Sequence, residues 1–99
     1  MTKFAPIHPG EILRTEFLDE LGITPYALAK NAGIDKGNFS RIINGKSGIS
    51  ADTALRLARF FGTSPDSWMN LQSRYDLETA KDRGMRRIEQ EVCSYESVI

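Results

Sequence analysis

The sequence has few of the residues on which disulfide-bonded, membrane-bound and catalytic proteins depend. Its 99 residues include one cysteine, one histidine and one tryptophan, and its formal net charge is zero. Because Cys93 is alone, no disulfide can form within the chain; this fits a reducing cytoplasm and leaves a disulfide between subunits open. No apolar run approaches the ~20 residues that span a bilayer, and the N-terminus lacks the apolar segment of a secretory signal. We therefore expect a cytoplasmic protein with no membrane partner.

The single histidine, His8, lacks the partners that a metal site or a catalytic site requires. A zinc site needs further ligands, and the one cysteine lies at the far end of the chain. No serine, cysteine or acid forms a recognisable catalytic pattern with His8, and no phosphate loop, redox motif or cofactor fingerprint is present. We expect no enzymatic activity, no cofactor and no metal, and we interpret His8 as the cap of the first helix.

Zero net charge argues at first against a nucleic-acid partner, but the charges are unevenly placed. Residues 24–62 carry six basic and two acidic side chains, a net charge of +4, whereas residues 1–23 and 63–99 each carry a net charge of −2. Phosphate neutralisation depends on the local field rather than on the total charge. A basic middle segment is therefore compatible with DNA binding, and its few cations predict modest affinity for unrelated DNA sequences.

Apolar spacing and capping signals predict five helices and no strand. The first helix begins near His8 and is ended by Gly22, and the fourth follows the capping residue Ser50. The fifth begins after Ser64, whose hydroxyl precedes a proline at the first helical position. The residues expected on the buried faces of the first and fourth helices are Ile12, Leu13, Phe17, Leu18, Leu21, Ala54, Leu55, Leu57, Ala58 and Phe61.

The fifth helix is expected to run to about Arg83, which gives one all-α domain over residues 1–83. Residues 84–99 form a short C-terminal extension of uncertain structure. Met85, Ile88 and Val92 allow a short amphipathic helix in it, but disorder fits the composition as well as order does.

The second and third helices show the pattern of a helix-turn-helix. Thr24 before a proline and Asp35 are their N-capping residues. Ala29 is small enough for two helices to cross closely, and Gly33 supplies the backbone freedom for a short turn. Any two short helices joined by glycine share part of this pattern, so it favours DNA binding without establishing it. The inward-facing residues are Leu28, Ala29, Ala32, Phe39, Ile42 and Ile43.

The candidates for DNA contact are the side chains of this motif that point away from the core. A recognition helix reads base edges from near its N-terminus, where asparagine pairs with adenine and lysine or arginine with guanine. Basic side chains can instead contact phosphate, and Thr24 can offer a hydroxyl and backbone N–H groups to it or act only as a cap. The alternative for all of them is a solvated surface. The candidate DNA-binding residues are Thr24, Lys36, Gly37, Asn38, Ser40, Arg41 and Lys46.

Large residues recur at helical spacing on the fifth helix, at Trp68, Leu71 and Tyr75. They allow two interpretations, a subunit interface, where Trp and Tyr are enriched, or closure of the monomer core by Trp68 against Phe60 or Phe61. A dimer is expected because one module with few cations would bind DNA weakly alone. We favour the interface on this helix because its large amphipathic residues exceed what one small core needs. The expected partners are a second copy of the chain and a palindromic operator in double-stranded DNA.

Taken in order, several blocks of the sequence resemble the HigA-type antitoxins, a branch of the helix-turn-helix regulators related to phage repressors. The resemblance spans about 70 of the 99 residues and lies in HPGEIL (8–13), LA (28–29), SRIINGK (40–46), ISADTALRLARFFG (49–62) and SPDSWMNLQSRYDL (64–77).

The resemblance implies a phage-repressor-like fold and a homodimer that binds a palindrome in its own promoter. It also implies that the protein neutralises a toxin encoded beside it, a RelE-like ribonuclease that cleaves mRNA. Gly37 and Asn38 leave the operator sequence open, and residues 84–99 lie outside the match. The alternative is a solitary repressor that has no toxin partner.

Overall fold

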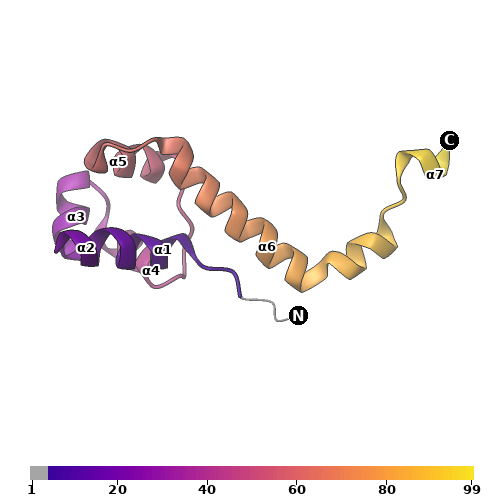
Figure 1. Ribbon diagram of the computed structural model, residues 1–99, viewed down its shortest axis with the longest axis horizontal. Helices are drawn as coiled ribbons and strands as arrows, with labels where there is room; N and C mark the ends of the chain where they lie inside the picture. Colours follow the sequence, from indigo (N-terminus) through magenta and orange to yellow (C-terminus); the bar gives the residue numbers. More distant parts are fainter. Residues whose placement is uncertain (1–4) are drawn as a thin grey trace.

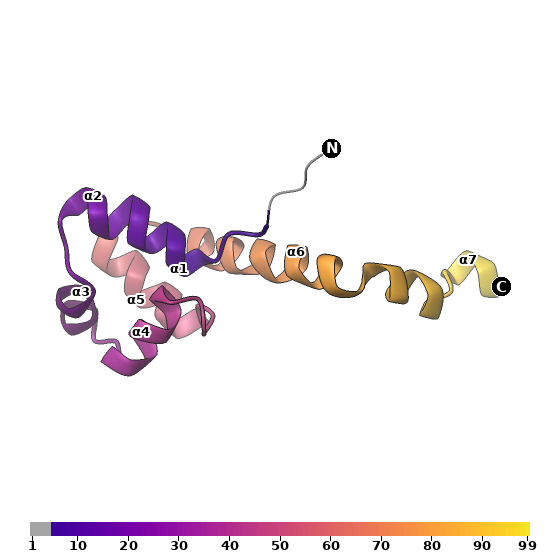
Figure 2. The ribbon, with the colours of Figure 1, turned by 90° about the horizontal axis from the view of Figure 1, so that it is seen from below.

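The computed structural model describes residues 5–99, which form a helical body from which one long helix extends (Figure 1, Figure 2). Every regular element in this range is a helix. The Cα radius of gyration is 17.0 Å, whereas a compact chain of 100 residues has a value of about 13 Å. The difference arises from α6 (Pro65–Glu91), whose C-terminal part leaves the body as an arm (Figure 1).

Three consecutive segments form one continuous N-terminal helix: α1 (Pro9–Ile12), the π-helical turn η1 (Leu13–Leu18) and α2 (Asp19–Leu21). His8 caps this helix, because its Nδ1 accepts a hydrogen bond from the Gly10 N–H at 2.9 Å. Gly22 ends it in the left-handed conformation, with a φ of 67°. The expected bounds and the capping role of His8 are confirmed, whereas the π-helical turn has no signal in the apolar spacing.

The helix-turn-helix consists of α3 (Pro25–Ala32) and α4 (Lys36–Ile43). Both expected N-caps form: the Thr24 hydroxyl accepts from the Ala27 N–H at 3.1 Å, and the Asp35 carboxylate accepts from the Asn38 N–H at 3.0 Å. Gly33 turns the chain between the helices with a φ of 67°, a conformation that glycine adopts at no steric cost. The motif is confirmed, together with its starting points.

The core lies where the N-terminal helix, α3, α4, α5 (Ala51–Phe61) and the start of α6 meet (Figure 2). These helices correspond to the five predicted from the sequence. Its buried apolar residues are Leu13, Leu18, Leu28, Ala29, Ile34, Phe39, Ile42, Ile49, Ala54, Leu57, Ala58 and Trp68.

Two residues expected in the core, Leu21 and Leu55, are each 60% exposed. Leu21 is the last residue of the N-terminal helix, where Gly22 turns the chain. Leu55 lies about 100° around α5 from Ala54, so it points away from the face on which Ala54 is buried. Thr53, which was not expected inside, is 4% exposed.

Gly10 permits the N-terminal helix to cross α4 in direct contact. A β-carbon at this position would overlap the carbonyl oxygen of Ile42, which belongs to the backbone of α4 and has little room to move. The glycine in the HPGEIL block therefore has a packing role.

Gly10→Ala is expected to lower the free energy of unfolding by about 1–3 kcal/mol, the usual cost of overpacking. The matched control is Gly84→Ala, since a β-carbon there would meet only the flexible Arg87 side chain, at 3.7 Å. Urea unfolding of the two variants beside the unmodified chain checks the difference. Equal midpoints for Gly10→Ala and the unmodified chain would contradict the packing role.

The loop between α4 and α5 is held to α6 by a buried glutamine. Gln72 Oε1 accepts a hydrogen bond from the Ile49 N–H at 2.7 Å, and Gln72 Nε2 donates to Asp76 Oδ1 at 2.9 Å. Gly48 makes room for this side chain, because a β-carbon there would lie 2.9 Å from Gln72 Nε2. The loop that carries Lys46 is therefore fixed relative to α6.

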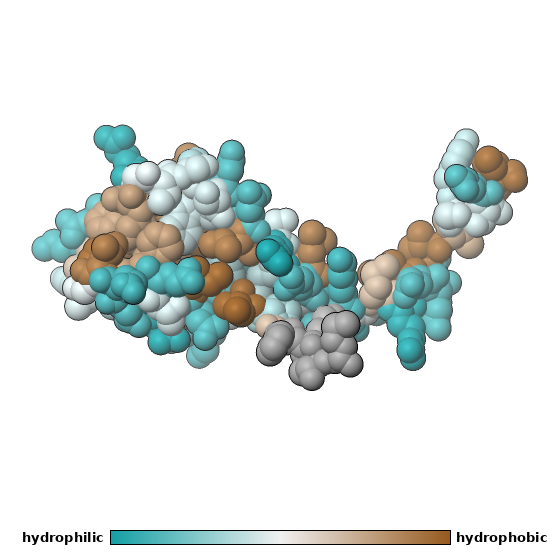
Figure 3. All heavy atoms as spheres, viewed as in Figure 1, coloured by the Kyte–Doolittle hydropathy of each residue, from teal (hydrophilic) through white to brown (hydrophobic). Residues whose placement is uncertain are grey.

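The arm continues beyond the expected end of the fifth helix. At Gly84 the backbone is non-helical (φ −156°, ψ 18°), and the bend is visible in Figure 1, but helix resumes and reaches Glu91. A short α7 (Tyr95–Val98) follows, so the tail is helical over most of its length. Figure 3 shows hydrophobic surface at intervals along the arm and at its C-terminal end. The exposed apolar residues of this part are Leu77, Met85, Ile88, Val92, Tyr95, Val98 and Ile99.

Candidate nucleic-acid interface

One face of α4 is buried and the opposite face is open to solvent. Phe39 and Ile42 are 1% and 0% exposed and hold the helix to the core. The predicted DNA-binding residues of α4 lie on the other face: Lys36, Gly37, Ser40 and Arg41 are exposed and Asn38 is half-buried. The structure thus gathers these five positions on one accessible helical surface.

Hydrogen bonds connect the polar side chains of this surface. Arg41 Nη2 lies 3.5 Å from Asn38 Oδ1, at the limit of a hydrogen bond, and Asn44 Nδ2 donates to Ser40 Oγ at 3.4 Å. The Lys46 N–H donates to the carbonyl oxygen of Arg41 at 2.8 Å, which places the start of the loop against the end of α4. Arg41 and the exposed Lys46 therefore bring two cations to the C-terminal end of this helix.

Thr24 lies at the exposed N-terminus of α3. Its hydroxyl oxygen is engaged as the cap, so the side chain has a structural role there. Pro25 has no N–H and the Ala27 N–H donates to the cap, so Tyr26 carries the remaining N–H of the first turn, at an end where the helix dipole favours an anion. Capping and phosphate binding at this position do not exclude each other.

Tyr26 belongs to the same surface and was missed by the sequence analysis. It is 55% exposed, and the Lys36 Nζ lies 4.1 Å from the centroid of its ring. With Pro25 and Ser40 these residues border a groove of about 380 Å³ between α3 and α4. The signal in the sequence is that Tyr26, a large aromatic residue, falls off the inward face formed by Leu28 and Ala29.

Arg56 has a structural role that its position in the basic segment does not reveal. Its Nε pairs with Asp52 Oδ2 at 2.8 Å, and its Nη1 donates to the carbonyl oxygens of Ala32 and Gly33 at 3.3 and 3.1 Å. It thereby satisfies carbonyls at the C-terminal end of α3. One of the six cations counted between residues 24 and 62 is therefore already engaged, and the positive field rests more heavily on the others.

The expectation that Trp68 forms a subunit contact is wrong. Its side chain is 2% exposed, its ring centroid lies 4.9 Å from that of Phe17 and 6.0 Å from that of Phe61, and Nε1 donates to Thr63 Oγ1 at 2.9 Å. The N-terminal helix and α5 together form the pocket that the indole fills. The alternative interpretation, in which Trp68 closes the monomer core against Phe61, is the one that the structure supports.

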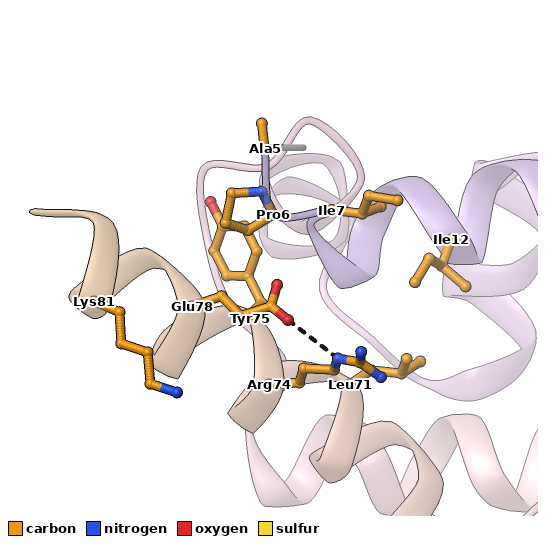
Figure 4. Close-up of a pocket in the computed structure, with 9 residues that line it drawn as sticks. All are labelled: Ala5, Pro6, Ile7, Ile12, Leu71, Arg74, Tyr75, Glu78 and Lys81. Carbon is orange, nitrogen blue, oxygen red and sulfur yellow. Dashed lines mark hydrogen bonds and ion pairs between the residues drawn. The ribbon is translucent and has the colours of Figure 1, made fainter. Parts of the chain in front are cut away.

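Leu71 and Tyr75, one and two turns further along α6, are half-buried. Figure 4 shows both beside the N-terminal segment, and with Ile7 and Ile12 they line a cleft of about 580 Å³. The Tyr75 ring meets His8 edge to face, with the centroids 4.9 Å apart. Each side chain therefore keeps part of its surface available to a partner.

Residues 5–99 hold no group of three or more His, Cys, Asp or Glu side chains placed to bind a metal ion. Over the same range, no helix combines the length and the apolar character that crossing a membrane requires.

Comparison with known proteins assigns the family. A family model described as helix-turn-helix matches residues 15–68. Antitoxin HigA-1 of Vibrio cholerae is 39% identical over 82 residues, which cover 83% of this chain and 77% of that protein. The chain belongs to the HigA-type helix-turn-helix antitoxins. This antitoxin family consists of DNA-binding proteins and is not a class of enzymes.

This HigA-type chain is also similar to another curated protein and to solved antitoxin structures. The virulence-associated protein I of Dichelobacter nodosus is 48% identical over 75 residues, 76% of this chain and 69% of that one. The solved structure of Pseudomonas aeruginosa antitoxin HigA with the higBA promoter has a TM-score of 0.87 and 49% identity, and the match covers 91% of this chain and 98% of that chain. Antitoxin GraA in complex with its operator has a TM-score of 0.86 and 40% identity over 95% of both chains. The all-α fold predicted from the sequence is confirmed.

Proposed function

We propose that this HigA-type chain represses its own operon, by binding a palindromic operator as a homodimer, and neutralises a toxin encoded beside it. The observation that carries the DNA-binding part is the open polar face of α4, held on a helix-turn-helix whose opposite face is buried. Two relatives of the same fold were solved with a promoter and with an operator. A protein that acts on its own promoter works in the cytoplasm.

In the proposed complex the exposed face of α4 enters the major groove. Lys36 and Asn38, near the N-terminus of the helix, are assigned to base edges. Arg41 and Lys46, at its C-terminal end, are assigned to phosphates, and the N-terminus of α3 at Thr24 to a further phosphate. Gly37 and Ser40 have small side chains, so the helix backbone between these contacts can approach the DNA closely.

Arg41→Ala and Lys46→Ala are each expected to weaken binding and to flatten its salt dependence by about 0.9 in the slope of log K against log salt. The matched control is Arg59→Ala, an exposed arginine in the last turn of α5 that lies outside α4 and outside the proposed dimer contact. Titration of a duplex carrying the promoter region upstream of the gene, at four salt concentrations, measures the slopes. A slope that changes equally in the control would remove Arg41 and Lys46 from the interface.

Asn38→Ala is expected to have a different effect, because a residue that reads a base discriminates between sequences. The variant should lose its preference for the promoter over a shuffled duplex by about 1–3 kcal/mol, while its salt slope stays unchanged. Competition between the two duplexes, monitored by gel shift, separates this result from uniform weakening. Uniform weakening would assign Asn38 to the backbone instead.

We assign the proposed dimer contact to α6, through Leu71 and Tyr75. Both side chains are half-buried in the monomer, and they line the cleft of about 580 Å³ beside the N-terminal segment. A C2 contact would cover such surface on both copies at once, since the same patch faces itself. Trp68, which is 2% exposed, supports this surface from inside the core.

Leu71→Ala and Tyr75→Ala are expected to give folded monomers in sedimentation analysis. The control is Leu55→Ala on α5, which removes an equally large side chain that is 60% exposed and lies outside the proposed interface. Unfolding at unchanged stoichiometry would assign both residues to the core alone. Deletion of residues 84–99 tests whether this segment forms the dimer contact. If the deletion alone gives monomers, the interface lies in residues 84–99 and not at Leu71 and Tyr75.

The toxin part of the proposal rests on membership of the antitoxin family, and the toxin we propose is a RelE-like ribonuclease that cleaves mRNA. The decisive test is the neighbouring reading frame: its product should arrest growth and cleave mRNA when expressed alone, and co-expression of this chain should restore growth. The two proteins should also co-purify. A neighbour that is harmless when expressed alone, with the promoter still bound by this chain, would favour the alternative of a solitary repressor.

A further inference from the structure

Tyr26 and Lys36 form a contact that joins the two helices of the motif on their outer surface. Tyr26 is the second residue of α3, and Lys36 is the first residue of α4. The ammonium nitrogen lies 4.1 Å from the centroid of the aromatic ring. This distance is well inside the ~6 Å within which a cation is attracted to the face of an aromatic ring.

The contact is not part of the hydrophobic core. Tyr26 is 55% exposed, and Lys36 is exposed as well. The neighbouring residues of α3 that hold the motif together, Leu28 and Ala29, are 0% and 2% exposed. Because more than half of Tyr26 is exposed, burial alone does not account for an aromatic residue in this position, and a role on the surface does.

The surface in question is the DNA-facing one. Lys36 and Ser40 are four residues apart on α4, and Asn44 follows at the cap of the helix, so the three form one row. All three border the groove between α3 and α4 together with Tyr26. A lysine side chain on its own is flexible, and ordering it on binding costs conformational entropy. A ring that already holds the ammonium at the start of the recognition helix removes part of that cost before the DNA arrives.

We propose that Tyr26 is a positioning residue that holds the Lys36 ammonium in place for DNA contact. The inference rests on the proposed function, since it assigns Lys36 to the operator. Tyr26 itself acts through its ring and not through its hydroxyl. Specificity or affinity that depends on Lys36 therefore depends also on the aromatic residue ten positions earlier in the chain.

A double-mutant cycle tests the coupling, with a duplex of the gene's own promoter region as the probe. Tyr26→Leu should weaken binding about two- to fivefold, which corresponds to the loss of an exposed cation–π contact. The same substitution in a Lys36→Met background should have no further effect, and Tyr26→Phe, which keeps the ring, should bind as the unmodified chain does. Thermal melting of each variant checks that the fold is retained.

Two results of the cycle would overturn the inference. An equal loss from Tyr26→Leu in both backgrounds would show that Tyr26 acts independently of Lys36. A loss from Tyr26→Phe as large as that from Tyr26→Leu would show that the hydroxyl makes its own contact.

A second readout separates this inference from the proposed function. In the free protein, the ring current of Tyr26 should move the NMR signals of the Lys36 ε-protons upfield, and Tyr26→Leu should return them to ordinary values. Absence of this shift overturns the inference even if the promoter is bound. Failure of the unmodified chain to bind the promoter, with the shift present, refutes the proposed function while the ring–ammonium contact stands.

Discussion

Phe39→Ala is expected to lower the free energy of unfolding by about 3–5 kcal/mol, as for other aromatic residues truncated in a core. Phe39 is 1% exposed and is the largest residue that α4 contributes to the core. The cost arises from the lost burial and from a cavity that the surrounding helices cannot close. Chemical denaturation followed by circular dichroism measures it.

The matched control for this prediction is the next residue, Ser40→Ala, which changes the exposed face of the same helix. It should alter the free energy of unfolding by less than about 0.5 kcal/mol. A change below about 1 kcal/mol for Phe39→Ala would mean that α4 is not packed through this face, because buried aromatic truncations cost several times more.

Trp68→Ala should be as costly, again about 3–5 kcal/mol, because the indole fills a pocket between two other helices. Its contacts with Phe17 and Phe61 and its hydrogen bond to Thr63 are all within the monomer. The loss of stability should therefore not depend on protein concentration, as long as the oligomeric state stays the same.

The neighbouring Met69 provides the control, since it is 37% exposed on the same turn of α6. Met69→Ala should cost less than about 1 kcal/mol, as substitutions away from the core usually do. If Trp68→Ala instead left a stable monomer and abolished only the dimer, the residue would belong to the interface and its placement in the core would be refuted.

The features of the fold that depend on neighbouring residues were predictable from the sequence. His8, Thr24, Asp35, Ser50 and Ser64 were each expected to cap a helix, and each accepts a hydrogen bond from a backbone N–H of the helix that follows. These signals are local, because a cap and its partner lie within three residues. The element boundaries followed from them, together with the glycines that end three of the helices.

The features that depend on contacts between distant elements were not predictable. Gly10 has a packing role because it meets Ile42, and Gln72 is buried because it binds the Ile49 backbone, 23 residues earlier. Trp68 was expected at an interface for the same reason: periodicity on α6 shows a stripe, but not which other helix covers it. Here the N-terminal helix and α5 cover it.

The candidate site likewise contains some residues that could be predicted from the sequence and others that could not. The exposed positions of α4 followed from the helical period once Phe39 and Ile42 were placed inside, since the remaining residues must face outward. Tyr26 and Arg56 were not identified, because each makes its contact with another helix. Tyr26 meets Lys36 on α4, and Arg56 binds backbone carbonyls at the end of α3. A single sequence carries no record of such pairs.

The measurement that tests the central claim most directly is a hydroxyl-radical footprint of the promoter region upstream of the gene. The proposed function predicts protection of two symmetric half-sites whose centres lie ~34 Å apart, one helical turn of DNA. Arg41→Ala should weaken both half-sites together. Protection of a single unsymmetrical half-site would contradict the account. So would the absence of protection at a protein concentration at which a related protein saturates its own operator.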